Sequence, residues 1–244
     1  MGRTRISAVA AAAVLTLAAC GSDSAGDDDA APSVIATTTI WADVTREVAC
    51  EGLAEVSTVI PPGGDPHSFE PSLRDREALG DAVLIVANGL GLEESLEDTI
   101  DAVETEGVSV VRVGESIVPL PSDDSGHDDD HDETGDDDHE TTGDEDHDET
   151  DGEDADHDDH GAEDPHFWFD PTRVAATLPA IADGLAAAGI DRAALDACVA
   201  DYTDRLERLD TELQDTVSVL PVEQRLLITN HDSLSYFADR YEFE

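Results

Sequence analysis

The chain has 244 residues, of which 60 are acidic and 12 are basic, and every basic residue is an arginine. The formal charge of −48 leaves no basic patch, so the composition argues against nucleic acid as a partner and favours a cation. The charge is unevenly spread, because residues 122–164 hold 24 of the acidic residues and no arginine. The rest of the chain is acidic but ordinary enough to fold.

The amino terminus has the pattern of a secretory signal peptide. Residues 1–19 carry two arginines, then an unbroken apolar run, then small residues. The run is too short for a transmembrane anchor, which needs about 20 apolar residues. Leu-Ala-Ala-Cys followed by Gly resembles the cleavage box of bacterial lipoproteins, which predicts an acylated Cys20 and a polar tether over residues 20–33. The mature protein is then expected on the outer face of the bacterial cytoplasmic membrane, held there by lipid.

Short apolar runs then alternate with helical patterns, which predicts a parallel sheet flanked by helices. Strands are expected at SVIATTTI, AEVSTVI, AVLIVANG and VSVVRV, and helices over residues 41–50, from residue 74 and over residues 92–103. After the acidic stretch, a further helix is expected from HFWFDPT to residue 188. Residues 34–190 are therefore assigned to one amino-terminal α/β lobe.

A long helix is predicted over residues 191–220, because apolar residues recur at intervals of three or four. The positions are Leu195, Val199, Tyr202, Leu206, Leu209, Leu213, Val217 and Leu220. A rod of about 45 Å, at ~1.5 Å per residue, is long enough to join two lobes. RLLITN predicts a strand that opens a second lobe over residues 225–244, and a lone strand leaves its backbone groups unpaired. The expected fold is two small parallel-sheet α/β lobes joined by a long helix, with most of the second lobe missing from this chain.

Cys50 and Cys198 remain as an even pair once Cys20 carries lipid. An exported protein lies in an oxidising compartment, where a disulfide between the two is permitted. Two buried thiols are the alternative, and the sequence does not decide between them.

The nine histidines fall into two sets. Six lie in the acidic stretch: His127, His131, His139, His147, His157 and His160. Because this stretch has no apolar periodicity and repels itself, residues 122–164 are predicted to be a disordered loop that binds metal weakly, or only a solvated insertion. The other three, His67, His166 and His231, lie in segments with predicted structure. A lone histidine is usually structural, but three such positions, two of them in Asp-Pro-His, favour a metal site.

Three segments resemble the metal loops of the zinc and manganese solute-binding lipoproteins of ABC importers. They are PPGGDPHSFEPS, DPHFWFDP and TNHDSLSYFADRY, and the resemblance runs from Ser33 to the last residue. It implies a metal held between two lobes by His67, His166 and His231, with a fourth ligand, usually a carboxylate, expected beyond residue 244. It also implies a monomer that delivers its metal to an ABC permease of the membrane.

Zinc is the expected metal and manganese the alternative, because manganese-specific relatives tend to carry a glutamate where this chain has His231, and imidazole suits zinc better. Two other functions stay open. A zinc store or adhesin-like surface protein would be built around the acidic stretch, and a zinc hydrolase would use three histidines with an open position. No enzymatic activity is expected, because Gly-x-Ser-x-Gly and His-Glu-x-x-His motifs are absent from the sequence.

Overall fold

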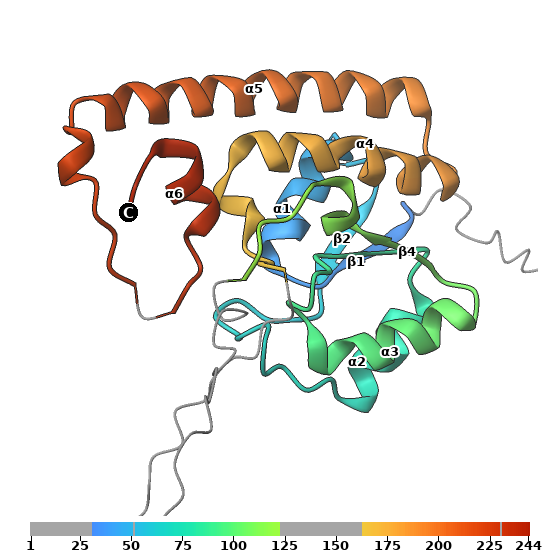
Figure 1. Ribbon diagram of the computed structural model, residues 1–244. Coiled ribbons are helices and arrows are strands. Elements are labelled where there is room, and N and C mark those ends of the chain that lie inside the picture. Colours follow the sequence, from blue (N-terminus) through green and yellow to red (C-terminus); the bar gives the residue numbers. More distant parts are fainter. Residues whose placement is uncertain (1–30, 51, 123–162, 230) are drawn as a thin grey trace, which may run out of the picture. The chain divides into compact units, whose positions relative to one another are not determined.

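Helices cover both faces of a parallel sheet in the computed structural model, which describes residues 31–50, 52–122, 163–229 and 231–244 (Figure 1). The strands, in the spatial order β2-β1-β3-β4, are β1 (Ser33–Ala36), β2 (Glu55–Thr58), β3 (Leu84–Ala87) and β4 (Ser109–Arg112). All neighbouring strands are parallel, so their carboxyl ends meet at one edge. The four predicted strands are confirmed, each shorter than the apolar run that indicated it.

Alternate residues of these strands point to opposite faces, and each face has its own core. The helices in the described ranges are α1 (Thr39–Val48), α2 (Leu73–Asp81), α3 (Glu94–Thr105), α4 (Pro171–Ala187), α5 (Arg192–Ser218) and α6 (Ser235–Tyr241). Val34 and Val86 pack in the core under α1 and α4, whereas Ile35 and Ile85 pack with α2 and α3. Figure 1 shows α2 and α3 on the side of the sheet opposite α4 and α5. A sheet covered on both faces explains why the central strands β1 and β3 read as nearly continuous apolar runs.

The helices begin where the sequence supplies capping groups. The side chain of Thr38 accepts a hydrogen bond at the start of α1, and Ser72 forms a capping box with Asp75 at the start of α2. Asp170 caps α4, which has proline at its first position, and Asp191 caps α5. Local sequence therefore sets these boundaries before any packing contributes.

The long helix α5 is confirmed, with a length of about 40 Å at ~1.5 Å per residue. It packs against α4 and α1. Cys198, in its second turn, forms a disulfide with Cys50 just after α1, and their Cα atoms lie 5.6 Å apart. Of the two alternatives for this cysteine pair, the structure contains the disulfide.

The predicted apolar face of α5 is partly wrong. Leu209 and Leu220 are 43% and 40% exposed, whereas the neighbouring Asp210 is 7% exposed. Asp210 is buried because it accepts hydrogen bonds from Arg240 at 2.5 Å and from the Tyr241 hydroxyl at 3.1 Å, both on α6. A polar contact, rather than a leucine seam, therefore joins α6 to this part of α5.

The strand predicted at RLLITN is not formed. A short 3-10 turn (Val222–Gln224) precedes it, and residues 225–229 are irregular. Their backbone hydrogen bonds include one from Leu227 N–H to the Glu244 carbonyl (2.7 Å) and one from Glu244 N–H to the Arg225 carbonyl (2.8 Å). A strand needs a neighbour along its whole length, and the described residues supply only this short pairing. Ile228 is accordingly 89% exposed.

Several expectations lie outside the described residues: the signal peptide over 1–19, lipidation of Cys20, and metal binding by the six histidines of the acidic stretch. The two ends of that stretch do meet, because Pro121 and Glu163 form an antiparallel bridge. Among the helices that the structure describes, none is both long and apolar enough to cross a membrane. The described residues from 31 onward belong to one compact unit.

Candidate metal site

The two Asp-Pro-His motifs fold into the same local turn. In each, the aspartate Oδ1 accepts the backbone N–H of the histidine two residues later, at 3.1 Å from Asp65 to His67 and at 2.8 Å from Asp164 to His166. The intervening proline fixes φ, and aspartate favours turns of this side chain-to-backbone kind. The backbone that carries each histidine side chain is therefore constrained.

His166 is the most constrained of the three predicted ligands. Its side chain is buried, and Nδ1 lies 2.8 Å from Asp164 Oδ1. Burial raises the pKa of Asp164, but hydrogen bonds from the ring and the backbone N–H of His166 outweigh it and hold that pKa below its usual value. An ionised carboxylate can only accept a hydrogen bond, so the Nδ1 atom that contacts it carries the proton. In that tautomer the lone pair that can bind a metal is on Nε2.

His67 lies in the loop between β2 and α2, beyond the carboxyl edge of the sheet, and is half-buried. The Ser68 hydroxyl donates to Asp65 Oδ2 at 2.7 Å and braces the turn. Burial raises the pKa of Asp65, but hydrogen bonds from Ser68 and from the His67 N–H together outweigh it and bring that pKa below its usual value. The loop therefore keeps an ionised carboxylate beside the ring at neutral pH.

Asn88 holds the His166 segment against the sheet. It follows β3 directly, and its buried amide donates to the carbonyl of Pro165 at 3.1 Å and to that of Gly89 at 2.8 Å. Its Oδ1 accepts the indole N–H of Trp41 at 2.7 Å, so every polar atom of the side chain is bonded. Because Pro165 immediately precedes His166, this amide fixes the backbone from which the ring departs.

A buried carboxylate, Glu93, orders the loop that carries Asn88. It accepts hydrogen bonds from the Thr37 hydroxyl, from the Asn88 N–H at 2.8 Å and from the Gly89 N–H at 3.2 Å. Complete burial raises the pKa of Glu93, and these three bonds oppose the rise. Sequence reasoning missed both Asn88 and Glu93. The available signal was a polar residue, Asn88, directly after an apolar strand, at the edge where ligands gather.

The three predicted ligands come together in space. The ring centroids of His67 and His166 lie 5.4 Å apart, those of His166 and His231 lie 5.6 Å apart, and those of His67 and His231 lie 6.5 Å apart. Three imidazoles on one tetrahedral zinc, with Zn–N of about 2.05 Å, would place their centroids about 5 Å apart. Two of the three separations are therefore close to those of a zinc site.

The widest separation involves His231, the exposed ring on the irregular segment before α6. No group of three or more His, Cys, Asp or Glu side chains within the described ranges already lies at metal-holding distances. Coordination by these rings therefore needs a small inward movement, on the order of 1 Å for the widest pair. His231 is the ring placed to make it, because it is exposed whereas His67 is half-buried.

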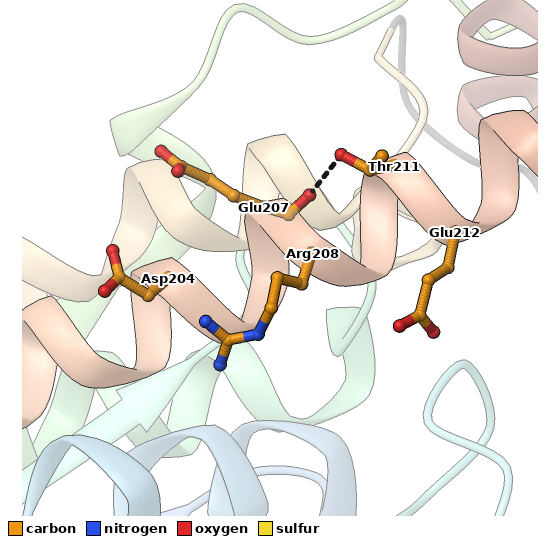
Figure 2. Close-up of a pocket in the computed structure, with 5 residues that line it drawn as sticks. All are labelled: Asp204, Glu207, Arg208, Thr211 and Glu212. Carbon is orange, nitrogen blue, oxygen red and sulfur yellow. Dashed lines mark hydrogen bonds between the residues drawn. The ribbon is translucent and has the colours of Figure 1, made fainter.

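A surface hollow of about 420 Å³ lies elsewhere, along one face of α5 (Figure 2). The described residues that line it are Asp204, Glu207, Arg208, Thr211 and Glu212. The Thr211 hydroxyl donates to the Glu207 carbonyl at 3.0 Å, a bond within the helix itself. Its three carboxylates are not among any metal-holding group in the described ranges, so we assign the hollow no part in metal binding.

Comparison with known proteins decides the family. The family model described as ZnuA, zinc-uptake complex component A periplasmic, matches residues 34–244. The chain belongs to this ZnuA family. Manganese-binding lipoprotein MntA of Halalkalibacterium halodurans is 28% identical over 233 residues, which are 94% of this chain and 65% of MntA. Zinc-binding protein TroA of Treponema pallidum is 30% identical over 218 residues, which are 88% of this chain and 59% of TroA.

The solved structure of the periplasmic zinc-binding protein TroA from Treponema pallidum matches with a TM-score of 0.67 at 26% identity, over 88% of this chain and 65% of that chain. The parallel-sheet α/β fold of the ZnuA family is thus present here, and the resemblance of the three motifs to the zinc and manganese solute-binding lipoproteins is confirmed. The chain spans about two thirds of the length of the relatives that it matches.

Proposed function

We propose that this chain captures Zn²⁺ outside the cytoplasm and delivers it to an ABC permease, with His67, His166 and His231 as ligands. The observation that carries the proposal is the convergence of three imidazoles from three separate segments, with centroids 5.4–6.5 Å apart. One of them, His166, is already oriented by a buried carboxylate, an arrangement that fixes the ring orientation of a metal-binding imidazole. Membership of the ZnuA family supports the transport role.

The donor set favours zinc over manganese. Imidazole nitrogen suits zinc, whereas manganese prefers oxygen donors. MntA is named for manganese and TroA for zinc, so the names of the relatives allow either metal. The fourth position on the zinc would be taken by a ligand from beyond residue 244 or by water.

Capture and release fit the site better than catalysis. A zinc hydrolase needs a carboxylate placed to move a proton of a metal-bound water. Asp164 instead bonds the ring and backbone of His166, and Asp65 bonds Ser68 and the backbone of His67. These two carboxylates are engaged in orienting the histidine ligands, so they do not supply that proton transfer.

Deleting residues 123–162 should leave one tight zinc site intact. Pro121 and Glu163 already lie side by side, so a short glycine linker joins the ends without moving His166. Competition titration with a zinc chelator should show one tight equivalent in both proteins and additional weak equivalents only in the parent. Loss of the tight equivalent on deletion would instead make the chain a zinc store built on the acidic stretch.

Replacing Cys20 with alanine should release the protein from membranes, because a lipid on that residue is the proposed anchor. Fractionation of cells that express the parent and the variant checks this, with Ser24→Ala as a control substitution in the same tether. Equal membrane association of the parent and Cys20→Ala would contradict lipid anchoring.

A further inference from the structure

The residues that flank the acidic stretch pair with each other, and the side chain of Tyr236 takes the place of one backbone hydrogen bond in this pairing. Residues 120–121 and 163–164 run antiparallel, and Asp164 N–H donates to the Leu120 carbonyl at 2.9 Å. In a regular antiparallel pair the reciprocal bond would join Leu120 N–H to the Asp164 carbonyl. Here Leu120 N–H donates to the Tyr236 hydroxyl at 3.0 Å, and that hydroxyl donates to the Asp164 carbonyl at 2.7 Å. The phenol of α6 therefore completes the pairing.

The packing around the ring of Tyr236 fixes the position of its hydroxyl. The residue is fully buried, the Phe167 ring stands edge-on at 6.3 Å, and the guanidinium of Arg173 lies 4.6 Å from the ring centroid. Burial also raises the pKa of Tyr236, so the phenol keeps the proton that it donates. Both hydrogen-bonding roles of the hydroxyl are filled by groups of the His166 segment and its partner strand.

A short, internally bonded segment connects this anchor to His231. Ser233 N–H donates to the His231 carbonyl at 3.0 Å, and the Ser235 hydroxyl donates to Asp232 at 2.8 Å. These bonds limit the freedom of the residues between the ring and α6, so the position of Tyr236 constrains the position of His231.

One residue, Asp164, contacts both His166 and Tyr236. The carboxylate of Asp164 holds the ring and N–H of His166, and its carbonyl accepts the hydroxyl of Tyr236. The other end of α6 is tied elsewhere, by Arg240 to Asp210 on α5. Loss of the phenol hydroxyl would therefore leave α6 attached but release its metal-side end from the His166 segment.

We propose that Tyr236 is a positioning residue that sets the distance between His231 and His166, and thereby the affinity for zinc. The inference rests on the proposed function. It follows that zinc binding and the Tyr236 contact strengthen each other, because coupling between two events is reciprocal.

Tyr236→Phe keeps the ring and removes only the hydroxyl. Zinc affinity, measured by chelator competition on the whole chain, should fall about fivefold, with unfolding of the metal-free protein still cooperative. Tyr202→Phe is the matched control, because Tyr202 on α5 also lies under a guanidinium, that of Arg205 at 5.1 Å, but far along the chain from the histidines. Its zinc affinity should stay within twofold of the parent. Equal affinities of the two variants would overturn the proposal.

Combining Tyr236→Phe with His231→Ala separates positioning from general loosening. If Tyr236 acts by placing His231, its substitution should change zinc affinity less than twofold once that imidazole is gone. A full fivefold loss in the His231→Ala background would mean a structural role only and would overturn the proposal. If His231→Ala itself leaves affinity unchanged, the ligand set is wrong and the proposed function fails first.

Hydrogen exchange at the Leu120 amide supplies a readout on the unmodified protein. Zinc should slow this exchange, because binding stabilises the contact to which that amide donates. If Tyr236→Phe does not fold, this measurement on the parent protein still tests the proposal. The amide of Leu195, which is distant from the site, serves as the reference. A Leu120 exchange rate that zinc does not change would reject the coupling between zinc binding and the Tyr236 contact.

Discussion

Replacing His166 with alanine should weaken zinc binding about a hundredfold or more, equivalent to about 2.7 kcal/mol. The side chain is buried and its Nδ1 is held by Asp164, so the ring is already ordered. It therefore loses little conformational entropy when the metal binds. Its removal takes away the best-prepared donor and leaves a buried carboxylate without its ring partner. Chelator competition at neutral pH measures the change.

His67→Ala and His231→Ala should each weaken the same site, by at least tenfold, because their rings are less buried and gain more order on binding. His160→Ala is the matched control from the acidic stretch and should leave the tight equivalent unchanged. A tight site that survives His166→Ala and is lost on His160→Ala would place the chemistry in the acidic stretch.

Breaking the disulfide should have the largest effect on folding stability. Cys50 and Cys198 are 148 residues apart, and closing a loop of that size restricts the unfolded chain by about 5 kcal/mol in the chain-entropy model. Cys198→Ser should therefore lower the free energy of unfolding by up to about that amount, a large part of the 5–15 kcal/mol typical of a domain. Urea unfolding followed by circular dichroism measures it.

The double variant Cys50→Ser with Cys198→Ser controls for the free thiol that a single substitution leaves. Both should unfold at the same urea concentration as the reduced parent. If the reduced and oxidised parent proteins unfold at the same urea concentration, the disulfide contributes nothing to stability.

Local pattern was enough for most of the sheet and the helices that cover it. The central strands β1 and β3 are apolar runs, and the caps of α2 and α5, Ser72 and Asp191, directly precede these helices in the sequence. The prediction failed where the outcome depended on partners. The 225–229 segment has strand-forming residues but little to pair with among the described residues, and Leu209 is exposed because a buried Asp210 binds α6 in its place.

The metal site, too, was predictable from local sequence only in part. Residue type and the repeated Asp-Pro-His indicated which histidines to consider, and the fold brings their rings together. Nothing local indicated that Asn88 holds the carbonyl before His166, 77 residues away, or that Tyr236 bonds Leu120, 116 residues away. These contacts are made by single polar atoms between distant segments, and periodicity carries no signal for them.

X-ray absorption at the zinc edge tests the ligand assignment most directly. With one equivalent of zinc bound to the chain that lacks residues 123–162, the fine structure should show three imidazoles at about 2.0–2.1 Å and one further light donor. His67→Ala and His231→Ala should each reduce the imidazole count by one. A first shell without imidazole, or one that neither substitution changes, would contradict the assignment of zinc to His67, His166 and His231.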